Sequence, residues 1–224
     1  MSINIVEKID DLVKINNVLV SVSDKKNLET FIPQLVEINP EITIFSTGGT
    51  FARLKEILGE KSKCLIQVSD YTGQPETQGG LVKTLDFKIY LGILTETYNE
   101  SHKADLARTK SVPIDMVVVN LYPFKETISK QGVTVEDARG NIDIGGPCMI
   151  RASAKNYLRV ASVVDSKDYA AIINELKEKN NTISLKSRFE LAKKAFAHTA
   201  VYDRTIADFL SGKTFEEMSK CYKM

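Results

Sequence analysis

The segment IDMVVVNLYPF, residues 114–124, decides the fold. Within it, MVVVNL places apolar side chains at successive positions instead of alternate ones. A strand of this composition is buried on both faces, as happens in a parallel sheet that helices cover on both sides. The segment therefore predicts a central strand of an α/β fold.

Short strand-like runs and helical patterns alternate on both sides of this segment, which predicts a parallel sheet flanked by helices, with additional C-terminal helices. The other predicted strands are 18–22, 42–45, 63–70, 89–94 and 159–165, and a further helix is expected to begin at Pro147. The longest helical pattern covers 184–212, with an apolar stripe of Leu185, Phe189, Ala192, Phe196, Thr199, Ile206 and Leu210. We expect one domain, 1–224, with a core from about 18 to 210 and a loose tail at 213–224.

Composition excludes several classes of function. With 30 basic and 29 acidic residues, the chain has no overall positive field that would attract nucleic acid. Three cysteines and two histidines occur without the spacing of a metal site, so no metal is expected and the thiols are predicted to be free. No stretch approaches the ~20 apolar residues of a membrane helix, and the N-terminus lacks the pattern of a signal peptide. We expect a soluble, cytoplasmic protein that binds neither nucleic acid nor membranes.

Polar motifs stand at the ends of the predicted strands, where ligands bind in open α/β sheets. STGGT, residues 46–50, ends a strand and opens a helix. Its glycines let backbone N–H groups surround an anion and the helix N-terminus adds partial positive charge, so a phosphate is the expected guest. The alternative is a tight turn with Thr50 as the helix N-cap. The motif matches neither the P-loop nor the dinucleotide fingerprint, so ATP and NAD are not indicated.

The other motifs also have structural alternatives. In SVSDK, Ser23 and Lys25 complete a phosphate cradle, or the Ser-Asp pair caps the next helix. Asn120 offers a donor and an acceptor for an amide or purine edge. Tyr122 is either functional or a core residue with its hydroxyl satisfied locally, which is the usual role of such a tyrosine. Asp143 either caps the following helix or is a buried functional group.

Lys83 interrupts the apolar segment GGLVKTLDFKIYLGIL, residues 79–94. A lysine in such a setting is best explained by a ligand that needs a positive charge. Lys155 in RASAKNY and His198 in AFAHTAVYD lie on predicted helices. By themselves they are more simply read as a solvated lysine and as a core or interface histidine.

The order of these motifs carries more information than any one of them. LVSVSDKKNL, STGGTFARL, VSDYTGQPE, VKTL, VVVNLYPF, NIDIGGPCMIRASAKN and KAFAHTAVYD, taken together, resemble the inosine monophosphate (IMP) cyclohydrolase domain. That domain usually forms the amino-terminal part of the bifunctional purine-biosynthesis enzyme, ahead of an aminoimidazole-carboxamide ribonucleotide (AICAR) transformylase. The resemblance runs from about Val18 to Leu210 and implies the methylglyoxal-synthase-like fold.

The resemblance also implies a reaction, in which 5-formamidoimidazole-4-carboxamide ribonucleotide closes its ring with loss of water to give IMP in de novo purine biosynthesis. The carboxamide nitrogen attacks the formyl carbon, so the site needs a proton acceptor near the amide and donors at the formyl oxygen. Because there is no redox change and no need for an electron sink, no cofactor is expected.

Matched motif by motif, the resemblance gives roles to particular residues. The catalytic group would be Lys83, Tyr122, Asp143 and Lys155. Asp143 with Lys155 would orient and deprotonate the amide, and the other two would serve the formyl oxygen and the leaving water. The implied substrate-binding residues are Ser23, Lys25, Thr47, Gly48, Gly49 and Thr50 around the phosphate and ribose, and Thr84, Asn120, Ile144 and Gly145 around the base.

The apolar stretch 79–94 departs from the family's usual form, which is close to GRVKTLHPKIHGGIL. Here Leu81 replaces the arginine, Asp86 and Phe87 replace the His-Pro pair, and Tyr90 replaces the second histidine. We hypothesise that Arg139, held by Asp86, supplies the charge that Leu81 lacks. The alternative is that this arginine is an ordinary solvated residue.

Two other classes of function stay open. One is a cyclohydrolase-derived enzyme with an altered substrate, and the other is a nucleotide-binding regulatory module of the same fold, as in carbamoyl phosphate synthetases. A regulatory module would need the phosphate cradle but not the whole catalytic group. A phosphate-eliminating lyase such as methylglyoxal synthase is disfavoured, since its Gly-Gly-Asp signature is absent. The resemblance and the apolar C-terminal helix lead us to expect a homodimer that acts as a stand-alone cyclohydrolase beside a separate transformylase.

Overall fold

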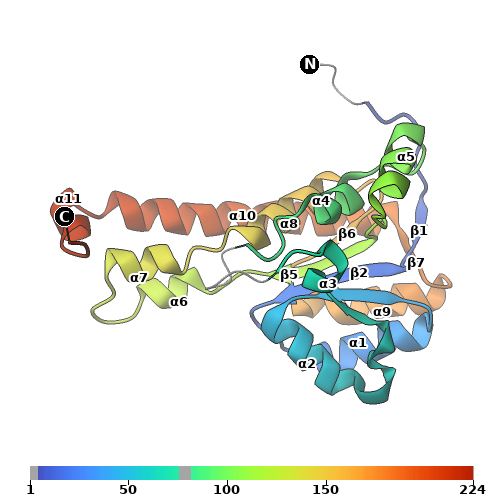
Figure 1. Cartoon of the computed structure of the whole chain (residues 1–224), viewed down its shortest axis with the longest axis horizontal. Helices are drawn as coiled ribbons and strands as arrows, with labels where there is room; N and C mark the ends of the chain where they lie inside the picture. Colours follow the sequence, from blue (N-terminus) through green and yellow to red (C-terminus); the bar gives the residue numbers. More distant parts are fainter. Residues whose placement is uncertain (1–4, 76–81, 224) are drawn as a thin grey trace.

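A computed structural model of the chain describes residues 5–75 and 82–223. Its centre is a parallel sheet in the order β4-β3-β2-β5-β6 (Figure 1), and every neighbouring pair in it runs parallel. The strands are β2 (Asn17–Val22), β3 (Thr43–Ser46), β4 (Leu65–Gln67), β5 (Met116–Asn120) and β6 (Ala161–Val163). The predicted α/β fold is therefore confirmed, with the segment 114–124 supplying β5 between β2 and β6.

Helices cover both faces of this sheet, because alternate side chains of each strand enter two separate hydrophobic cores. One core contains Val18 and Val20 of β2 and residues of α1 (Leu28–Ile38), α2 (Gly48–Leu58) and α9 (Tyr169–Glu178). The other contains Leu19 of β2 and residues of α4 (Phe87–Leu94), α8 (Gly145–Lys155) and α10 (Leu185–Ser211). Burial on both faces is the physical reason for the uninterrupted apolar run of β5.

Smaller elements complete the chain and surround these layers. A two-stranded antiparallel sheet joins the N-terminal segment to the strand that precedes α10. The strands of this small sheet are β1 (Leu12–Lys14) and β7 (Thr182–Ser184). The remaining short helices are η1 (Gly59–Cys64), α3 (Val68–Thr72), α5 (Glu100–Thr109), α6 (Phe124–Ile128), α7 (Val135–Gly140), η3 (Ser166–Asp168) and α11 (Phe215–Ser219). No helix in the described ranges has the length and apolar character required to cross a membrane.

The segment 89–94, predicted to be a strand, is instead part of helix α4. The carboxylate of Asp86 caps this helix by accepting the backbone N–H of Lys88 at 2.8 Å. A short apolar run does not distinguish a buried strand from a buried helix. The strand prediction was wrong because Asp86, as the N-cap residue, begins a helix here. Helix α8 was also predicted to begin at Pro147, but it begins at Gly145.

Helix α10 extends well beyond the sheet, and α6, α7 and α11 lie along its outer part (Figure 1). Its buried face differs from the predicted stripe: it consists of Arg188, Leu191, Ala192, Ala195, Thr199 and Tyr202. Phe189 and Phe196 of the predicted stripe are 45% and 40% exposed. The predicted loose tail contains α11, which begins with a capping box formed by Thr214 and Glu217.

The inward position of Arg188 explains why hydrophobicity alone gave the wrong helix face. Its guanidinium is fully buried and donates hydrogen bonds to the carbonyl oxygens of five residues. These acceptors are Asp10, Asp11, Tyr157, Leu158 and Ile183. An arginine satisfied in this way can occupy a core position.

Candidate active site

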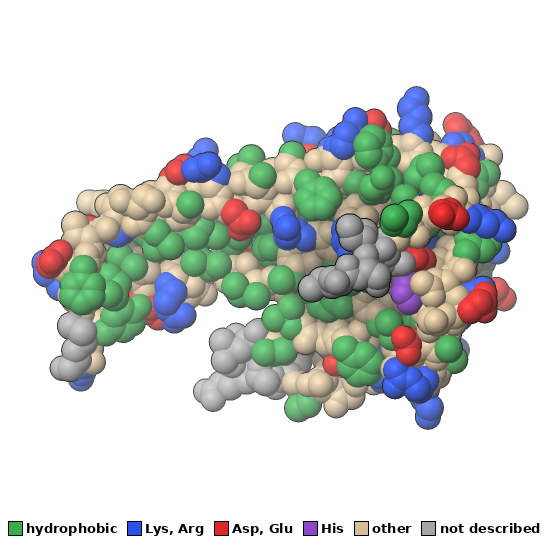
Figure 2. Space-filling view, turned by 90° about the horizontal axis from the view of Figure 1, so that it is seen from above, with side chains coloured by type: hydrophobic (Ala, Val, Ile, Leu, Met, Phe, Trp, Pro, Cys, Tyr) green, Lys and Arg blue, Asp and Glu red, His purple; other side chains and the backbone are tan. Residues whose placement is uncertain are grey.

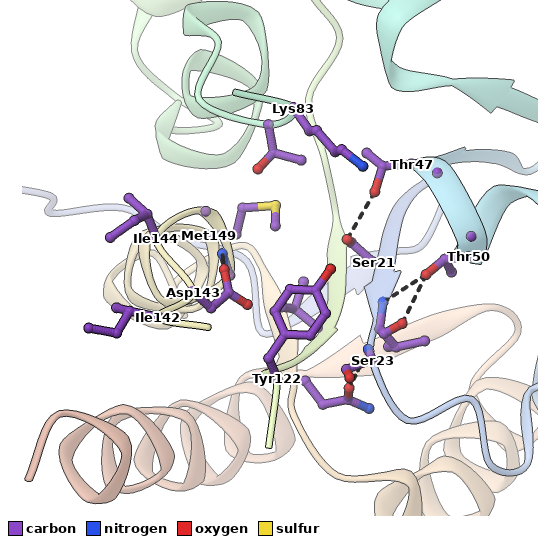
Figure 3. Close-up of a pocket in the computed structure, with 18 of the residues that line it drawn as sticks. Ser21, Ser23, Thr47, Thr50, Lys83, Tyr122, Ile142, Asp143, Ile144 and Met149 are labelled. Atoms are coloured by element: carbon purple, nitrogen blue, oxygen red, sulfur yellow. Dashed lines mark hydrogen bonds between the residues drawn. The ribbon is translucent and has the colours of Figure 1, made fainter. Parts of the chain in front are cut away.

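A cavity of about 450 Å³ opens at the carboxyl edge of the sheet, beyond the ends of β2, β3 and β5 (Figure 3). All the predicted site residues except Lys155 line it. Those in the lining are Ser23, Lys25, Thr47, Gly48, Gly49, Thr50, Lys83, Thr84, Asn120, Tyr122, Asp143, Ile144 and Gly145. The structure therefore brings these residues together around one cavity.

One side of the cavity is the N-terminus of α2. Thr47 stands at the N-cap position but makes no capping hydrogen bond, because its hydroxyl pairs with the hydroxyl of Ser21 at 3.1 Å. The N–H groups of Gly48 and Gly49, the first two residues of α2, therefore have no side-chain cap, which leaves them available to an anion. Gly48 has φ +44°, and a Cβ placed there would lie 3.3 Å from Nζ of Lys83. The lysine ammonium thus lies directly against the glycine turn.

Thr50 and Asn120 were predicted to contact the ligand, but their side chains form hydrogen bonds with the backbone. The Thr50 hydroxyl accepts the backbone N–H of Val22 at 3.1 Å and donates to the Val22 carbonyl at 3.0 Å. The Asn120 amide oxygen accepts the backbone N–H groups of Ser23 and Asp24 at 2.7 and 2.9 Å, and its nitrogen donates to the Asp24 carbonyl at 2.8 Å. Both side chains fix the loop after β2, so their polar groups are engaged with backbone.

The opposite side of the cavity holds Asp143. Its Oδ1 accepts the backbone N–H of Gly146 at 2.9 Å, so the residue caps the start of α8 and also faces the cavity. Burial raises the pKa of this carboxyl, while the backbone N–H groups of Gly146 and Tyr122 act in the lowering direction. A carboxylate with a raised pKa is a better proton acceptor than an exposed one.

Tyr122 lies between the two sides (Figure 3). Its side chain is 58% exposed, so it is not the core residue that the sequence also allowed. Thr84 is buried, and a Cβ at Gly145 would lie 2.7 Å from the Thr84 hydroxyl. This close approach requires a glycine at the first position of α8 and joins the Lys83 segment to the Asp143 segment.

The structure does not bring Lys155 to the cavity. It is the last residue of α8, whose first residue, Gly145, lines the cavity. At 1.5 Å per residue the two helix ends are roughly 15 Å apart. Lys155 is exposed at the far end, so a direct catalytic role within this chain is not supported.

The Arg139 hypothesis is wrong. The guanidinium of Arg139 binds the carboxylate of Glu136 on its own helix, at 2.6 Å, and does not line the cavity. Asp86, the intended partner, is the N-cap of α4. Leu81, whose missing charge motivated the idea, lies outside the described residues.

Sequence reasoning missed several lining residues, of which Ser21 and Met149 are examples. Ser21 is the one polar side chain between the valines of β2, and its alternation with Val20 and Val22 was a usable signal. Tyr202 was quoted only as part of a motif, yet its hydroxyl oxygen accepts the backbone N–H of Asp143 at 2.8 Å. No local pattern indicates a contact between residues 59 positions apart.

The cavity is large enough for a small molecule, with the α2 N-terminus at one end and Tyr122 and Asp143 at the other. No group of three or more His, Cys, Asp or Glu side chains suited to a metal ion occurs in the part of the chain that is described. Fold and site together define an α/β domain with an anion-suited helix N-terminus on one side of a cavity and a half-buried carboxylate on the other.

Comparison with known proteins agrees with this class. The MGS-like domain family matches residues 27–148, and the AICARFT/IMPCHase bienzyme family matches residues 153–224. The chain belongs to the MGS-like domain family, and the predicted resemblance to the IMP cyclohydrolase family is confirmed.

Individual relatives show the same relationship. The bifunctional purine biosynthesis proteins PurH of Bacillus subtilis and of a Thermoanaerobacter species are 47% and 50% identical over 91% and 87% of this chain. The chain spans only 38% and 37% of their lengths. A solved structure described as ForH superposes with a TM-score of 0.77 and 29% identity, over 89% of this chain and all of that one.

Proposed function

We propose that the chain is an IMP cyclohydrolase, which closes the ring of 5-formamidoimidazole-4-carboxamide ribonucleotide with loss of water in de novo purine biosynthesis. The observation that carries this proposal is the combination, in one cavity, of an uncapped helix N-terminus with Lys83, Tyr122 and Asp143. The first feature suits the ribonucleotide phosphate, and the other three supply groups that the ring closure needs.

In the proposed reaction a bond forms between the carboxamide nitrogen and the formyl carbon. The formyl oxygen leaves as water with two protons, one from the carboxamide nitrogen and one from the formamido nitrogen. Asp143 accepts the carboxamide proton, since burial raises the pKa of its carboxyl. The Lys83 ammonium and the Tyr122 hydroxyl stabilise and protonate the formyl oxygen. Lys155 of the same chain lies at the far end of α8 and is given no step here, and the proposed reaction needs no metal or organic cofactor.

Three of the four departures from the usual family sequence lie away from the cavity, which is consistent with an unaltered substrate. Asp86, Phe87 and Tyr90 do not line the cavity. Asp86 caps α4, Phe87 is the exposed first residue of that helix, and the Tyr90 hydroxyl is buried. These replacements therefore concern how α4 begins and packs, not the shape of the ligand site.

We also propose that the chain works as a cytoplasmic homodimer. The formylated substrate requires a transformylase to make it, and the bienzyme family that matches residues 153–224 joins AICARFT and IMPCHase in its name. The homodimer is supported by exposed aromatic side chains on α10, among them Phe189 and Phe196.

The test is to add the formamido ribonucleotide to the purified chain and to follow IMP by chromatography, with Asp143→Asn as the inactive control. We expect IMP from the wild type, also after dialysis against a chelator. Tight binding of IMP without any turnover would instead identify a nucleotide-binding module. Turnover that is lost with the chelator and restored by zinc or magnesium would contradict the metal-free mechanism.

A further inference from the structure

We infer that Tyr202 of α10 is a positioning residue, whose hydroxyl holds the backbone of Asp143 where catalysis requires it. The inference rests on the proposed function, because it takes Asp143 to be the proton acceptor. It gives a task to the motif KAFAHTAVYD, whose tyrosine has no other role in the site.

The Asp143 segment depends on contacts from outside itself. Residues 141–144, between α7 and α8, form no regular secondary structure. The backbone N–H of Asp143 donates to the Tyr202 hydroxyl oxygen at 2.8 Å, while Oδ1 accepts the Gly146 N–H at 2.9 Å. The first contact holds the main chain and the second orients the carboxylate, so together they fix the carboxylate relative to the cavity.

Tyr202 is itself firmly held. It is 8% exposed, and its ring packs edge-on against Phe124 with centroids 6.2 Å apart. Phe124, at the start of α6, is 2% exposed and follows Tyr122 by two positions. One phenol therefore joins α10 to both the Asp143 segment and the segment that carries Tyr122.

Removal of the hydroxyl would leave the Asp143 N–H without its partner in a half-buried place. A shift of about 1 Å in a catalytic group costs up to about 100-fold in rate. The binding of the phosphate at α2 does not depend on this contact. The effect should therefore fall on kcat and leave KM nearly unchanged.

The experiment compares Tyr202→Phe with Tyr71→Phe. The Tyr71 hydroxyl also accepts a backbone N–H, that of Val112 at 2.9 Å, and is likewise part-buried, but Tyr71 does not line the cavity. Both variants lose a phenol oxygen that accepts a main-chain N–H. We expect Tyr202→Phe to lower kcat at least 10-fold with KM within twofold of wild type, and Tyr71→Phe to leave kcat within twofold.

A second readout is amide hydrogen exchange, followed by NMR. The Asp143 amide should lose protection in Tyr202→Phe and keep it in Tyr71→Phe. If Tyr202→Phe does not fold, Phe124→Leu, which loosens the ring but keeps the hydroxyl, should lower kcat in the same way. Equal kcat in the two tyrosine variants, or an unchanged kcat in Phe124→Leu, would overturn the inference. A wild type that makes no IMP would contradict the proposed function instead, and the exchange of the Asp143 amide would still test the contact.

Discussion

At the scale of single residues, the surroundings of the Asp143 carboxylate lower the stability of the folded protein when it is ionised, but they suit its proposed role as a proton acceptor. Burial raises the pKa of its carboxyl above the ordinary value for aspartic acid. The folded protein therefore binds this proton more tightly than the unfolded chain, and the ionised form that a base needs is disfavoured by folding. Stability falls as pH rises through the raised pKa, while the fraction of active base increases.

Asp143→Asn should lower kcat by ~10²–10⁴-fold, because a positioned proton acceptor is lost. The melting temperature at pH 7 should not decrease, since the neutral amide keeps an acceptor for the Gly146 N–H and removes a half-buried charge. The acid limb of the wild-type kcat profile should lie above the pH range of an ordinary carboxyl and should vanish in the variant. A parallel loss of kcat and of IMP affinity, measured by calorimetry, would mean that Asp143 binds rather than catalyses.

Asn120 illustrates a polar residue whose task is to hold the binding loop. Asn120→Ala removes the acceptor of the Ser23 and Asp24 N–H groups, so the loop next to the α2 N-terminus loses its fixed shape. We expect KM to rise about 10-fold, with kcat less affected.

The matched control for this prediction is Asn39→Ala. The Asn39 amide also joins two backbone segments, donating to the Ile15 carbonyl at 3.0 Å and accepting the Glu41 N–H at 3.1 Å, but it lies away from the cavity. This variant should be destabilised without a change in KM. An unchanged KM in Asn120→Ala would show that the loop keeps its shape without the amide.

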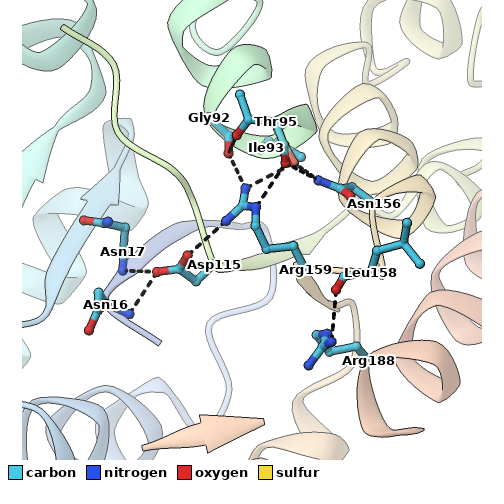
Figure 4. A network of polar contacts seen from close by, with 10 residues as sticks. All are labelled: Asn16, Asn17, Gly92, Ile93, Thr95, Asp115, Asn156, Leu158, Arg159 and Arg188. Atoms are coloured by element: carbon cyan, nitrogen blue, oxygen red, sulfur yellow. Dashed lines mark hydrogen bonds and ion pairs between the residues drawn. The ribbon is translucent and has the colours of Figure 1, made fainter. Parts of the chain in front are cut away.

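At the scale of elements, the helix after Lys83 is held in place by a buried ion pair. Arg159 donates to Asp115 at 3.0 Å and to the carbonyl oxygens at the end of α4, those of Gly92, Ile93 and Thr95 (Figure 4). Asp115 in turn accepts two backbone N–H groups just before and at the start of β2. The network ties α4 to the central strands from the side opposite the cavity mouth.

Arg159→Met should lower the free energy of unfolding by ~3–5 kcal/mol, because the Asp115 carboxylate, 6% exposed, would stay buried without its partner. The control is Arg108→Met, which breaks an exposed pair with Asp105 at 2.8 Å and should change stability by less than about 0.5 kcal/mol. Urea unfolding measures both values. Similar small losses in the two variants would show that water replaces the buried pair.

At the scale of the whole molecule, the extension formed by α10 with α6, α7 and α11 narrows away from the sheet and carries hydrophobic side chains along the face that Figure 2 presents. On the flank where α10 meets α8, Phe189 contacts Tyr157 edge-on and Phe196 lies beneath Arg151. Both phenylalanines remain at least 40% exposed. An aromatic surface of this kind is typical of an interface between protein chains.

We expect light scattering to give the mass of a dimer at micromolar concentration and Phe196→Glu to give that of a monomer. Val201→Glu is the control, because Val201 is 68% exposed on another side of the same helix. It should leave the dimer intact. A monomeric wild type would contradict the homodimer, and dissociation by Val201→Glu alone would place the interface on the other side of α10.

Much of the fold and of the site position followed from the sequence, because both depend on local patterns. The uninterrupted apolar run of residues 116–119 indicates burial on two faces, and parallel strands bring their carboxyl ends to one edge. Motifs at those ends therefore had to meet. Thr47 after β3 and Tyr122 after β5 are placed in this way, whereas Lys83 and Asp143 precede helices and were assigned to the same site by the family resemblance.

Only the tertiary structure decided what each polar group contacts. Asn120 and Thr50 look like ligand contacts in sequence, but they bind the backbone of the neighbouring loop. Lys155 lies at the end of α8 that is remote from the cavity of its own chain, and Tyr202 contacts Asp143 across 59 positions. A hydrogen bond requires two atoms about 3 Å apart, and for residues distant in sequence that distance is set by how whole helices pack on the sheet.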